Sequence, residues 1–350
     1  MRAGGPVLSV GDDCATHKKE DPMRKLIVLT ALAGLATFAA LTALPAGASP
    51  RGVNGQVAYD RTDFATGDSS VYTANPDGSH EQLLVANTSG PSWSHDGTKL
   101  AMPDLTDDGR HGTATVNADG SDYTQLPIND PTLNVACFGG AWSPNDAQLA
   151  CEGWDDSNAA RNGIYTLSSA DGSDLTRLTT NPIGGGDEPG AYSPDGKRIV
   201  FLRRDQNQDG VGLFVVKTNH TDLRQITPPG TLIQSGNDGD WSPQGNEIVF
   251  SRHVTADVRG SIWVIHADGS GLREIHVQGL PCGGSVFDPN GFGCHGVHWS
   301  PDGDKIIFAA NSPATGRNIY TANADGSDLF QVTHDGGDDD PSWGTHPPVG

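Results

Sequence analysis

Apolar and polar residues alternate in short segments along most of the chain, and turn-forming residues separate these segments. Within one stretch, Lys99 to Met102, Gly112 to Asn117 and Tyr123 to Leu126 are each short and rich in β-formers or alternating residues. Such segments are typical of β-strands. An aromatic residue ends a fourth strand. The pattern therefore predicts units of four antiparallel strands.

Two turn phrases recur at the ends of these strands. The first joins an aromatic residue to Ser-Pro-Asp-Gly or a close variant. Its proline presets φ for the first turn position, and its glycine takes the left-handed conformation that lets the chain fold back. The copies are Trp93–Gly97, Trp142–Asp146, Tyr192–Gly196, Trp241–Gly245 and Trp299–Gly303.

The second phrase contains Asp-Gly and supplies the other hairpin turn of each unit, because this dipeptide suits a turn whose twist matches paired strands. One copy is degenerate. The copies are Pro76–Ser79, Ala118–Ser121, Ala170–Ser173, Thr218–Thr221, Ala267–Ser270 and Ala324–Ser327.

Regular spacing of the aromatic residues indicates a repeat architecture. Counted from Trp93 to Trp343, successive distances are 49, 50, 49, 58 and 44 residues. Units of this size that consist of β-hairpins alone are typical of β-propeller blades. The fold class predicted is all-β.

The two ends of the repeat region predict how the ring closes. Gly55 to Tyr59 starts with a second strand that has no first, and Pro341 to Trp343 is a first strand with nothing after it. Together they complete one blade, so we expect six four-stranded blades and no open sheet edge. The expected spans are 55–85 with 341–343, 91–126, 139–178, 189–227, 239–275 and 297–333.

The repeat resembles the WD40-like, or PD40, repeats of the TolB β-propeller family. The order Trp-Ser-Pro-Asp-Gly-x-x-Ile-x-Phe is nearly whole at 241–250 and 299–308, and the pattern covers 52–346. The sequence departs from this pattern at two places, with Asn219-His220 in one turn phrase and no Pro-Asp-Gly after Trp343. These departures affect individual turns and not the architecture.

The resemblance implies a propeller and a leaning toward protein binding. TolB carries an additional α/β domain before its propeller and works in the cell envelope with a peptidoglycan-associated lipoprotein. In this chain only Ser49 to Asn54 lies between the expected cleavage site and the first strand. We therefore do not transfer the transport-complex role.

The first part of the chain reads as targeting sequence. Residues 1–22 are a polar leader without periodicity, expected to be disordered or an artefact of start-codon choice. Residues 23–48 show the charged, apolar and small-residue order of a secretory signal peptide, with cleavage after Ala48. The apolar run 26–44 is also long enough for a membrane anchor. The small-residue exit favours export, secreted or into the envelope, and leaves 49–350 as one monomeric propeller domain.

The mature chain is strongly acidic. Of 43 acids and 22 bases, the first 48 residues hold four and five, which leaves 39 acids, 17 bases and a formal charge of −22. Nucleic acid and anionic lipid would be repelled, since binding phosphates needs clustered Lys and Arg. Cations or basic partners fit better. Acidity that simply keeps an exported protein soluble is the alternative.

Four cysteines remain in the mature chain, an even number that suits an oxidising compartment. Cys137 and Cys151 flank one predicted hairpin, and Cys282 and Cys294 bracket a Gly-rich insertion. Local pairing is expected among the three pairings that the sequence allows. A zinc site is the rival interpretation, but the chain has no close Cys-x-x-Cys.

Acidic residues gather in the segments that lead into the first strands, which should converge at one channel mouth. Several carboxylates facing one axis repel each other unless water or a cation intervenes. A bound cation is one interpretation, and solvated acidic loops that cap strand ends are the other. The candidate binding residues are Asp187, Glu188, Asp238, Asp240, His295, His298, Asp338, Asp339 and Asp340.

A second cation candidate is the segment 205–210. Asp205, Asn207 and Asp209 alternate with other residues before a glycine, as in the first half of a calcium loop. The twelfth position is Val216 and not the bidentate glutamate of an EF-hand. A calcium site and a plain polar hairpin loop both remain open.

Catalytic signatures do not occur in the sequence. There is no Gly-x-Ser-x-Gly, no His-Glu-x-x-His, no phosphate-binding glycine loop and no dinucleotide fingerprint. Histidines near the closing blade keep open a metal-dependent carbohydrate-active enzyme, a lyase or hydrolase: His295, His298, His334 and His346. The main hypothesis is a binding or scaffold module that acts through loops at the channel mouth and is stabilised by Ca²⁺ or another divalent cation. Its partner is an unidentified protein or cell-envelope ligand.

Overall fold

The computed structural model describes residues 52–137, 142–207, 209–233, 239–253, 260–280, 282–283, 293–312 and 316–349. These ranges all belong to the compact unit Leu44–Gly350. The expected leader and signal peptide, 1–22 and 23–48, lie outside them, as does Asp238. Within the described ranges, no helix has the length and apolar character needed to cross a bilayer.

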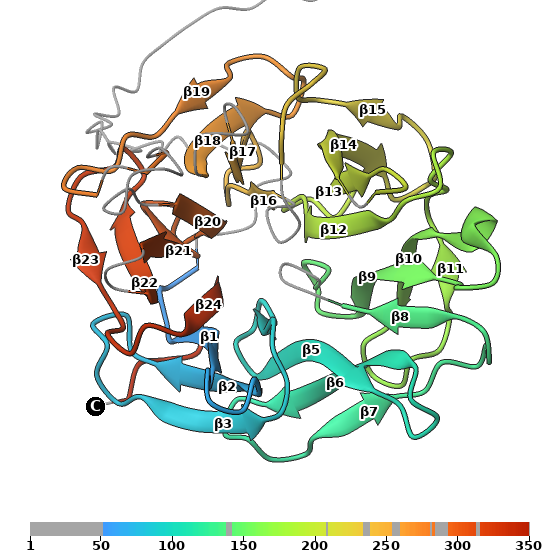
Figure 1. Ribbon diagram of the computed structural model, residues 1–350, viewed down its shortest axis with the longest axis horizontal. Coiled ribbons are helices and arrows are strands. Elements are labelled where there is room, and N and C mark those ends of the chain that lie inside the picture. Colours follow the sequence, from blue (N-terminus) through green and yellow to red (C-terminus); the bar gives the residue numbers. More distant parts are fainter. Residues whose placement is uncertain are drawn as a thin grey trace, which may run out of the picture. The chain divides into compact units, whose positions relative to one another are not determined.

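Six four-stranded antiparallel sheets form a ring, and the first strands β12, β16, β20 and β24 are seen toward its centre (Figure 1). Blade 1 combines β24 (Asp338–Trp343) with β1 (Val57–Thr62), β2 (Ser69–Ala74) and β3 (Gln82–Ala86). Blade 2 contains β4 (Ser92–Trp93), β5 (Lys99–Leu105), β6 (His111–Asn117) and β7 (Thr124–Leu126). Blade 3 contains β8 (Asn134–Ala136), β9 (Gln148–Trp154), β10 (Gly163–Ser168) and β11 (Thr176–Arg177), with the 3-10 turn η1 (Ala159–Arg161) between β9 and β10.

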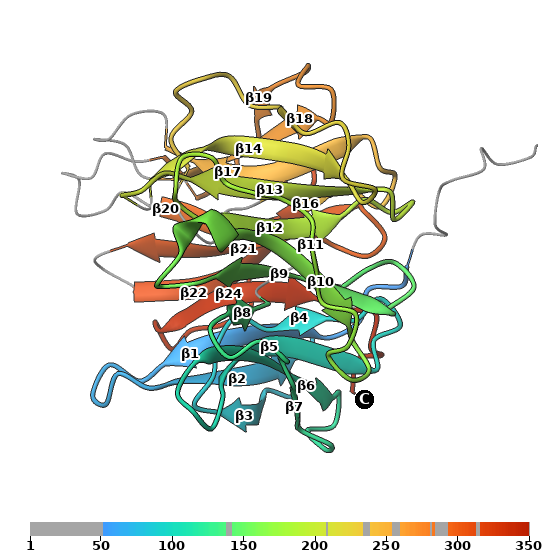
Figure 2. The same cartoon turned by 90° about the vertical axis from the view of Figure 1, so that its right-hand side faces the viewer.

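The remaining three blades follow the same order along the chain. Blade 4 contains β12 (Asp187–Tyr192), β13 (Arg198–Arg204), β14 (Gly210–Lys217) and β15 (Arg224–Gln225). Blade 5 contains β16 (Asp240–Trp241), β17 (Glu247–Arg252), β18 (Ser261–His266) and β19 (Arg273–Glu274). Blade 6 contains β20 (Gly293–Trp299), β21 (Lys305–Ser312), β22 (Gly316–Asn323) and β23 (Phe330–Gln331). The side view shows the blades stacked beside one another around the axis (Figure 2).

The first and last strands share blade 1, as the sequence predicts. Val57 pairs with Trp343 and Ala58 with Ser342 in antiparallel register. The indole Nε1 of Trp343 donates to the Gly55 carbonyl at 3.1 Å. Ring closure therefore rests on a full set of strand contacts between segments far apart in the sequence.

Neighbouring blades bury both faces of their second strands. In β21, the five residues from Ile306 to Ala310 are all 0% exposed. Ile306 and Phe308 pack with Val249 and Ile262 of blade 5, whereas Ile307 and Ala309 pack with β1 of blade 1. Because alternate side chains of a strand point to opposite faces, this two-sided packing requires the continuous apolar runs seen in the sequence.

The second turn phrase has the same hydrogen bonds in every blade. In blade 1, Asp77 Oδ1 accepts from the backbone N–H and the hydroxyl of Ser79, at 3.0 and 2.6 Å. In the degenerate copy, Asn219 Oδ1 takes the same two bonds from Thr221. His220 adopts the left-handed φ of 68° there. The departure from Asp-Gly thus preserves the turn.

Four first strands begin earlier than the sequence predicts. β8 starts at Asn134, β12 at Asp187, β20 at Gly293 and β24 at Asp338, where the expected blade spans begin at 139, 189, 297 and 341. β12, β20 and β24 pair with their second strands through a β-bulge, which lets pairing continue past an irregular residue. Several candidate residues therefore lie in strands and not in the loops before them.

Both local disulfides are confirmed. Cys137 is bonded to Cys151 with the Cα atoms 4.1 Å apart, and Cys282 to Cys294 with a Cα distance of 5.5 Å. Cys137 and Cys294 each stand five residues before the aromatic residue of their blade. The first disulfide joins the end of β8 to β9, and the second joins β20 to the preceding insertion.

Asp187 occupies the same position in blade 4 and forms an ionic latch there. Its carboxylate accepts from Arg203 Nε at 2.7 Å and Nη2 at 2.8 Å, and from Thr179 Oγ1 at 2.7 Å. Thr179 Oγ1 in turn accepts from the Ile164 N–H of blade 3 at 2.9 Å. The latch thus joins strands within blade 4 and connects blade 4 to blade 3.

We predict that Asp187→Ala costs about 3–5 kcal/mol in free energy of unfolding, because it leaves a buried guanidinium without its partner. The double variant Asp187→Leu with Arg203→Met should cost much less, since no charge is then buried alone. Urea unfolding followed by far-ultraviolet circular dichroism measures both. A double variant as unstable as the single one would contradict this account.

Candidate functional site

The two ends of the channel differ in chemistry. We call the side on which the first strands begin the acidic face. We call the opposite side, which carries both turn phrases, the turn face. Alternate connections of an antiparallel blade lie on opposite sides, so the loops between second and third strands belong to the acidic face.

Five carboxylates, which we call the channel acids, lie near the axis on the acidic face. Two come from second strands and three from first strands. They are Asp60, Glu152, Glu188, Asp339 and Asp340.

Glu152 of blade 3 and Glu188 of blade 4 share one positively charged partner, the guanidinium of Arg204. Arg204 Nη2 donates to Glu152 Oε1, and Arg204 Nη1 lies 3.8 Å from Glu188 Oε2. Burial raises the pKa of Glu152 to about 7, and the charge of Glu188 adds to the rise against the opposing pull of Arg204. One guanidinium therefore balances two buried carboxyl groups.

Asp339 of blade 1 is held by two side chains of blade 6. His295 Nε2 lies 2.8 Å from Asp339 Oδ1, and Arg317 Nη1 donates to Asp339 Oδ2. Burial opposes ionisation of Asp339, but the bond from His295 and the charge of Arg317 outweigh it and hold its pKa below the ordinary value. Burial raises the pKa of Asp60 to about 6, and Asp339 adds to the rise.

Among the channel acids, Asp340 is the one whose ionisation is opposed most strongly. Its backbone has a left-handed φ of 43°, which is strained for a residue other than glycine. Burial raises its pKa well above the ordinary value, and the charges of Asp339, Asp60 and Glu188 raise it further. Because Glu188 belongs to blade 4 and Asp340 to blade 1, the channel acids repel one another across the axis.

Of the nine expected binding residues, the structure brings together Glu188, His295, Asp339 and Asp340. Asp187 and Asp338 are fully buried in latches instead, Asp338 accepting from Arg61 Nε at 2.5 Å. Asp238 lies outside the described residues.

Asp240 and His298 lie elsewhere, at the turn-face end of the channel. Each directly precedes the aromatic residue of its blade, and both line a cavity there. His298 Nδ1 is 3.7 Å from Asp240 Oδ2. The expectation of one acidic mouth therefore combined residues from both ends of the first strands.

Sequence reasoning missed Asp60 and Glu152. Both occupy the fourth position after the start of the apolar run in their second strands, where the other blades carry proline, leucine, serine or alanine. Charge at a position that is otherwise uncharged was the available signal. A position-by-position comparison of the six repeats reveals it.

The calcium-loop candidate folds as a turn closed on itself. Asp205 Oδ1 accepts from the backbone N–H groups of Asn207 at 2.8 Å and Asp209 at 3.1 Å. Across the described part of the chain, no three His, Cys, Asp or Glu side chains are placed to hold a metal. His346 instead stacks on Trp93, with ring centroids 5.6 Å apart.

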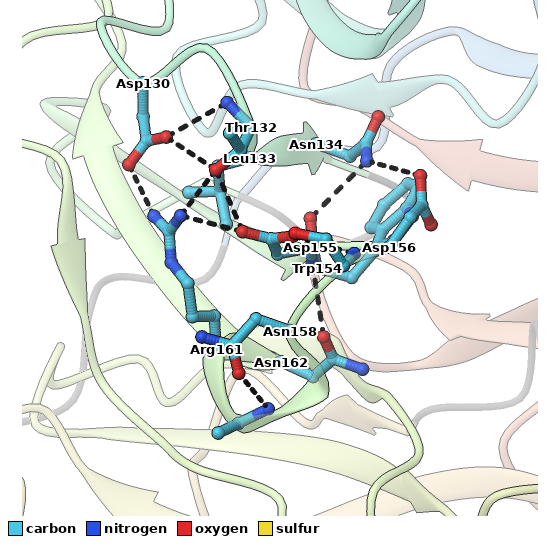
Figure 3. A network of polar contacts seen from close by, with 12 residues as sticks. Asp130, Thr132, Leu133, Asn134, Trp154, Asp155, Asp156, Asn158, Arg161 and Asn162 are labelled. Atoms are coloured by element: carbon cyan, nitrogen blue, oxygen red, sulfur yellow. Dashed lines mark hydrogen bonds and ion pairs between the residues drawn. The ribbon is translucent and has the colours of Figure 1, made fainter.

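A polar network fixes the rim of the acidic face at blade 3 (Figure 3). Arg161 Nη1 donates to Thr132 Oγ1 at 2.7 Å and to Asp155 Oδ2 at 2.9 Å, and Arg161 Nη2 donates to Asp130. Hydrogen bonds from Ser157 and Thr132, together with Arg161, hold the pKa of Asp155 well below its ordinary value. This network joins the loop before β8 to the loop after β9.

Large apolar side chains project from the loops and strand ends of the acidic face. Phe64 is 72% exposed and Leu105 60%, while Ile183 and Leu232 are 40% and 44% exposed. They come from blades 1, 2 and 4 and from the segment that leads into blade 5. The acidic mouth is thus surrounded by separate apolar contact points.

We predict that Glu152→Gln changes the pH dependence of stability. The folded-state pKa near 7 lies above the ordinary value, so the folded chain holds more protons than the unfolded chain between about pH 4.5 and 7. Stability from this group is present at low pH and lost as pH rises. Between pH 5 and 8, the variant should gain about 1–3 kcal/mol relative to the wild type.

Urea unfolding at both pH values measures this gain. The exposed acidic-face variant Asp107→Asn serves as the charge control and should show no such change. A difference between Glu152→Gln and wild type that stays constant with pH would contradict the prediction.

Comparison with known proteins places the chain in a family. A sequence model described as the TolB beta propeller domain matches residues 45–289. No curated protein matches the chain. Among solved structures, TolB from Acinetobacter baumannii is 17% identical with a TM-score of 0.63, over 83% of this chain and 66% of that chain.

Two other structures extend the comparison. A putative TolB from Agrobacterium tumefaciens is 17% identical with a TM-score of 0.55, over 81% of this chain and 90% of that one. A chain of a nidogen/laminin complex is 10% identical with a TM-score of 0.58, over 83% and 98%. At these identities the likeness shows the fold alone, and this chain spans just under two thirds of the Acinetobacter TolB. The family match covers more than half of the chain, and the chain folds into six four-stranded blades, so the chain belongs to the TolB β-propeller family.

Proposed function

We propose that this chain is an exported, monomeric propeller that binds a basic protein partner through its acidic face. The channel acids carry this proposal. They are buried near the axis and they outnumber Arg204 and Arg317. Burial raises the pKa of Asp60 and Asp340, and the mutual repulsion of the acids raises it further. A Lys or Arg side chain of a partner would relieve that repulsion, because an opposite charge favours the ionised carboxylate.

The surroundings of the mouth support a protein as the partner. Exposed apolar side chains such as Phe64 and Ile183 offer contacts that a free cation does not use. The Arg161 network and the latches hold the loops in fixed positions, which lowers the entropy lost on binding. The two disulfides fit an extracytoplasmic protein, in line with the apolar segment that precedes the propeller.

We further propose that a divalent cation such as Ca²⁺ stabilises the acidic face. The support is electrostatic, since Asp340 faces the charges of Asp339, Asp60 and Glu188 at close quarters. The described residues offer no preformed set of three ligands. The cation would therefore act by relieving the repulsion among the carboxylates, and water would complete its coordination. The loop at Asp205 remains a second candidate position.

The metal-dependent carbohydrate-active enzyme has no specific observation in its favour. The histidines expected to serve it are dispersed: His295 contacts Asp339, His298 lines the turn-face cavity and His346 stacks on Trp93. We therefore carry the binding module forward as the proposed function.

Site-specific photocrosslinking tests the proposed contact face. A photoreactive phenylalanine analogue replaces Phe64 or Ile183 on the acidic face. As matched exposed controls it replaces Tyr123 or Leu223, each of which directly precedes the outer strand of its blade. In cells that export the chain, we expect an adduct with one protein from the first pair only. Glu188→Gln should weaken that adduct, and so should added salt, because the contact is electrostatic. Adducts from the control pair alone would place the contact surface elsewhere.

Calcium titration tests the cation proposal. A chelator-treated sample should gain several degrees in Tm at millimolar CaCl₂, since a ligand that binds only the folded state stabilises it. Asp340→Asn should reduce this gain by removing one of the mutually repelling charges. NaCl at equal ionic strength is the control, and an equal gain with NaCl would reduce the effect to screening.

A further inference from the structure

A cavity lies at the turn-face end of the channel, away from the channel acids. It encloses about 370 Å³. The aromatic residues of the five first turn phrases line it together with Trp343, their counterpart in blade 1: Trp93, Trp142, Tyr192, Trp241, Trp299 and Trp343. Concave sites of this size with aromatic walls and a few polar groups are where proteins hold small ligands and peptide segments.

The cavity wall has one formal charge. Asp240 is the sole carboxylate among the described lining residues, and that lining contains no Lys or Arg. Asp240 Oδ2 accepts from the Trp299 backbone N–H at 2.8 Å, which fixes the carboxylate at the wall. His298 is its titratable neighbour, with Nδ1 3.7 Å away. A cationic occupant with an apolar stem complements this wall.

The chain itself supplies a segment beside the cavity. Gly52, the first described residue, lines the cavity, and its N–H donates to the Pro301 carbonyl at 3.0 Å. Two residues later, Asn54 and Asp302 exchange hydrogen bonds of 2.9 and 3.2 Å. These contacts attach the start of the propeller to the turn of blade 6, next to the blade that carries Asp240.

We propose that the segment Ser49-Pro50-Arg51 occupies this cavity in the mature protein, with the Arg51 guanidinium against the Asp240 carboxylate. The proposal rests on the expected cleavage after Ala48 and is independent of the acidic face. Three extended residues span about 10 Å, close to the diameter of a sphere of this volume. Before cleavage, the segment continues into the apolar run of the signal peptide and has no free end to enter.

Two features of the segment favour occupancy. Pro50 restricts the backbone, so less conformational entropy is lost on binding. The short connection to Gly52 gives the segment an effective concentration on the order of millimolar or higher, which fills even a weak site. An arginine can also bind a carboxylate through two parallel hydrogen bonds. Removal of the signal peptide would therefore leave the segment free to bind in the cavity.

The test compares two forms of the chain with defined first residues, one starting at Ser49 and one at Gly52. Each is titrated with the peptide Ser-Pro-Arg-amide while the fluorescence of the cavity tryptophans is recorded. The Gly52 form should bind the peptide at least about ten-fold more tightly, because in the Ser49 form the tethered segment competes. Arg51→Gln in the Ser49 form should restore most of this binding.

The Asp240 contact is tested in the Gly52 form. Asp240→Asn keeps an oxygen for the Trp299 N–H and should weaken peptide binding about ten-fold, as should replacing the peptide's arginine with neutral citrulline. The control Asp335→Asn removes an exposed carboxylate on the acidic face and should leave binding unchanged. Melting temperatures of all variants verify folding.

Three outcomes overturn the proposal. One is failure of the Gly52 form to bind the peptide. Another is equal binding by both forms, which would assign the cavity to a cationic segment of a partner. The third is an exported chain whose first residue, determined by mass spectrometry, is not Ser49.

Discussion

The antiparallel pairing of β1 with β24 is the contact on which the rest of the propeller depends. Each blade buries both faces of its second strand against two neighbours, as the alternating partners of Ile306 and Ile307 show. A ring of such blades has no stable partially assembled form, because every blade without a neighbour would expose an apolar face. Closing the ring satisfies all six blades at once and removes the free edges through which sheets aggregate.

Closure also brings six first strands around one axis, and this geometry sets the chemistry of the channel. Charges that would be separate on an open sheet lie close together and away from water, so burial and repulsion act on the same groups. Where a neighbouring strand supplies a guanidinium, as at Asp187, the carboxylate becomes a structural latch. Where the supply falls short, as at Asp340, an electrostatic conflict remains near the axis. The acidic face and the aromatic cavity thus lie at the two ends of the same channel.

Much of this architecture could be predicted from the sequence because the turn phrases report local geometry directly. Blade number, strand order, ring closure and both disulfide pairings follow from short-range patterns and from the incomplete units at the two ends. The bulges in β12, β20 and β24 could not be predicted, since a bulge depends on the partner strand as well as its own residues. For the same reason, Asp240 and Glu188 were expected together, although they lie toward opposite ends of the first strands.

Placing the last strand of the ring in the first blade has a consequence for biogenesis. The ribosome makes β24 long after β1, so a nascent chain holds an unfinished ring whose innermost strand in blade 1 is missing. Until that strand arrives, the translated blades lack the pairing that locks them. An exported protein must cross its membrane before it becomes compact, if it uses a pathway for unfolded chains. A fold whose ring-closing strand is synthesised last is suited to crossing a membrane first and becoming compact afterwards.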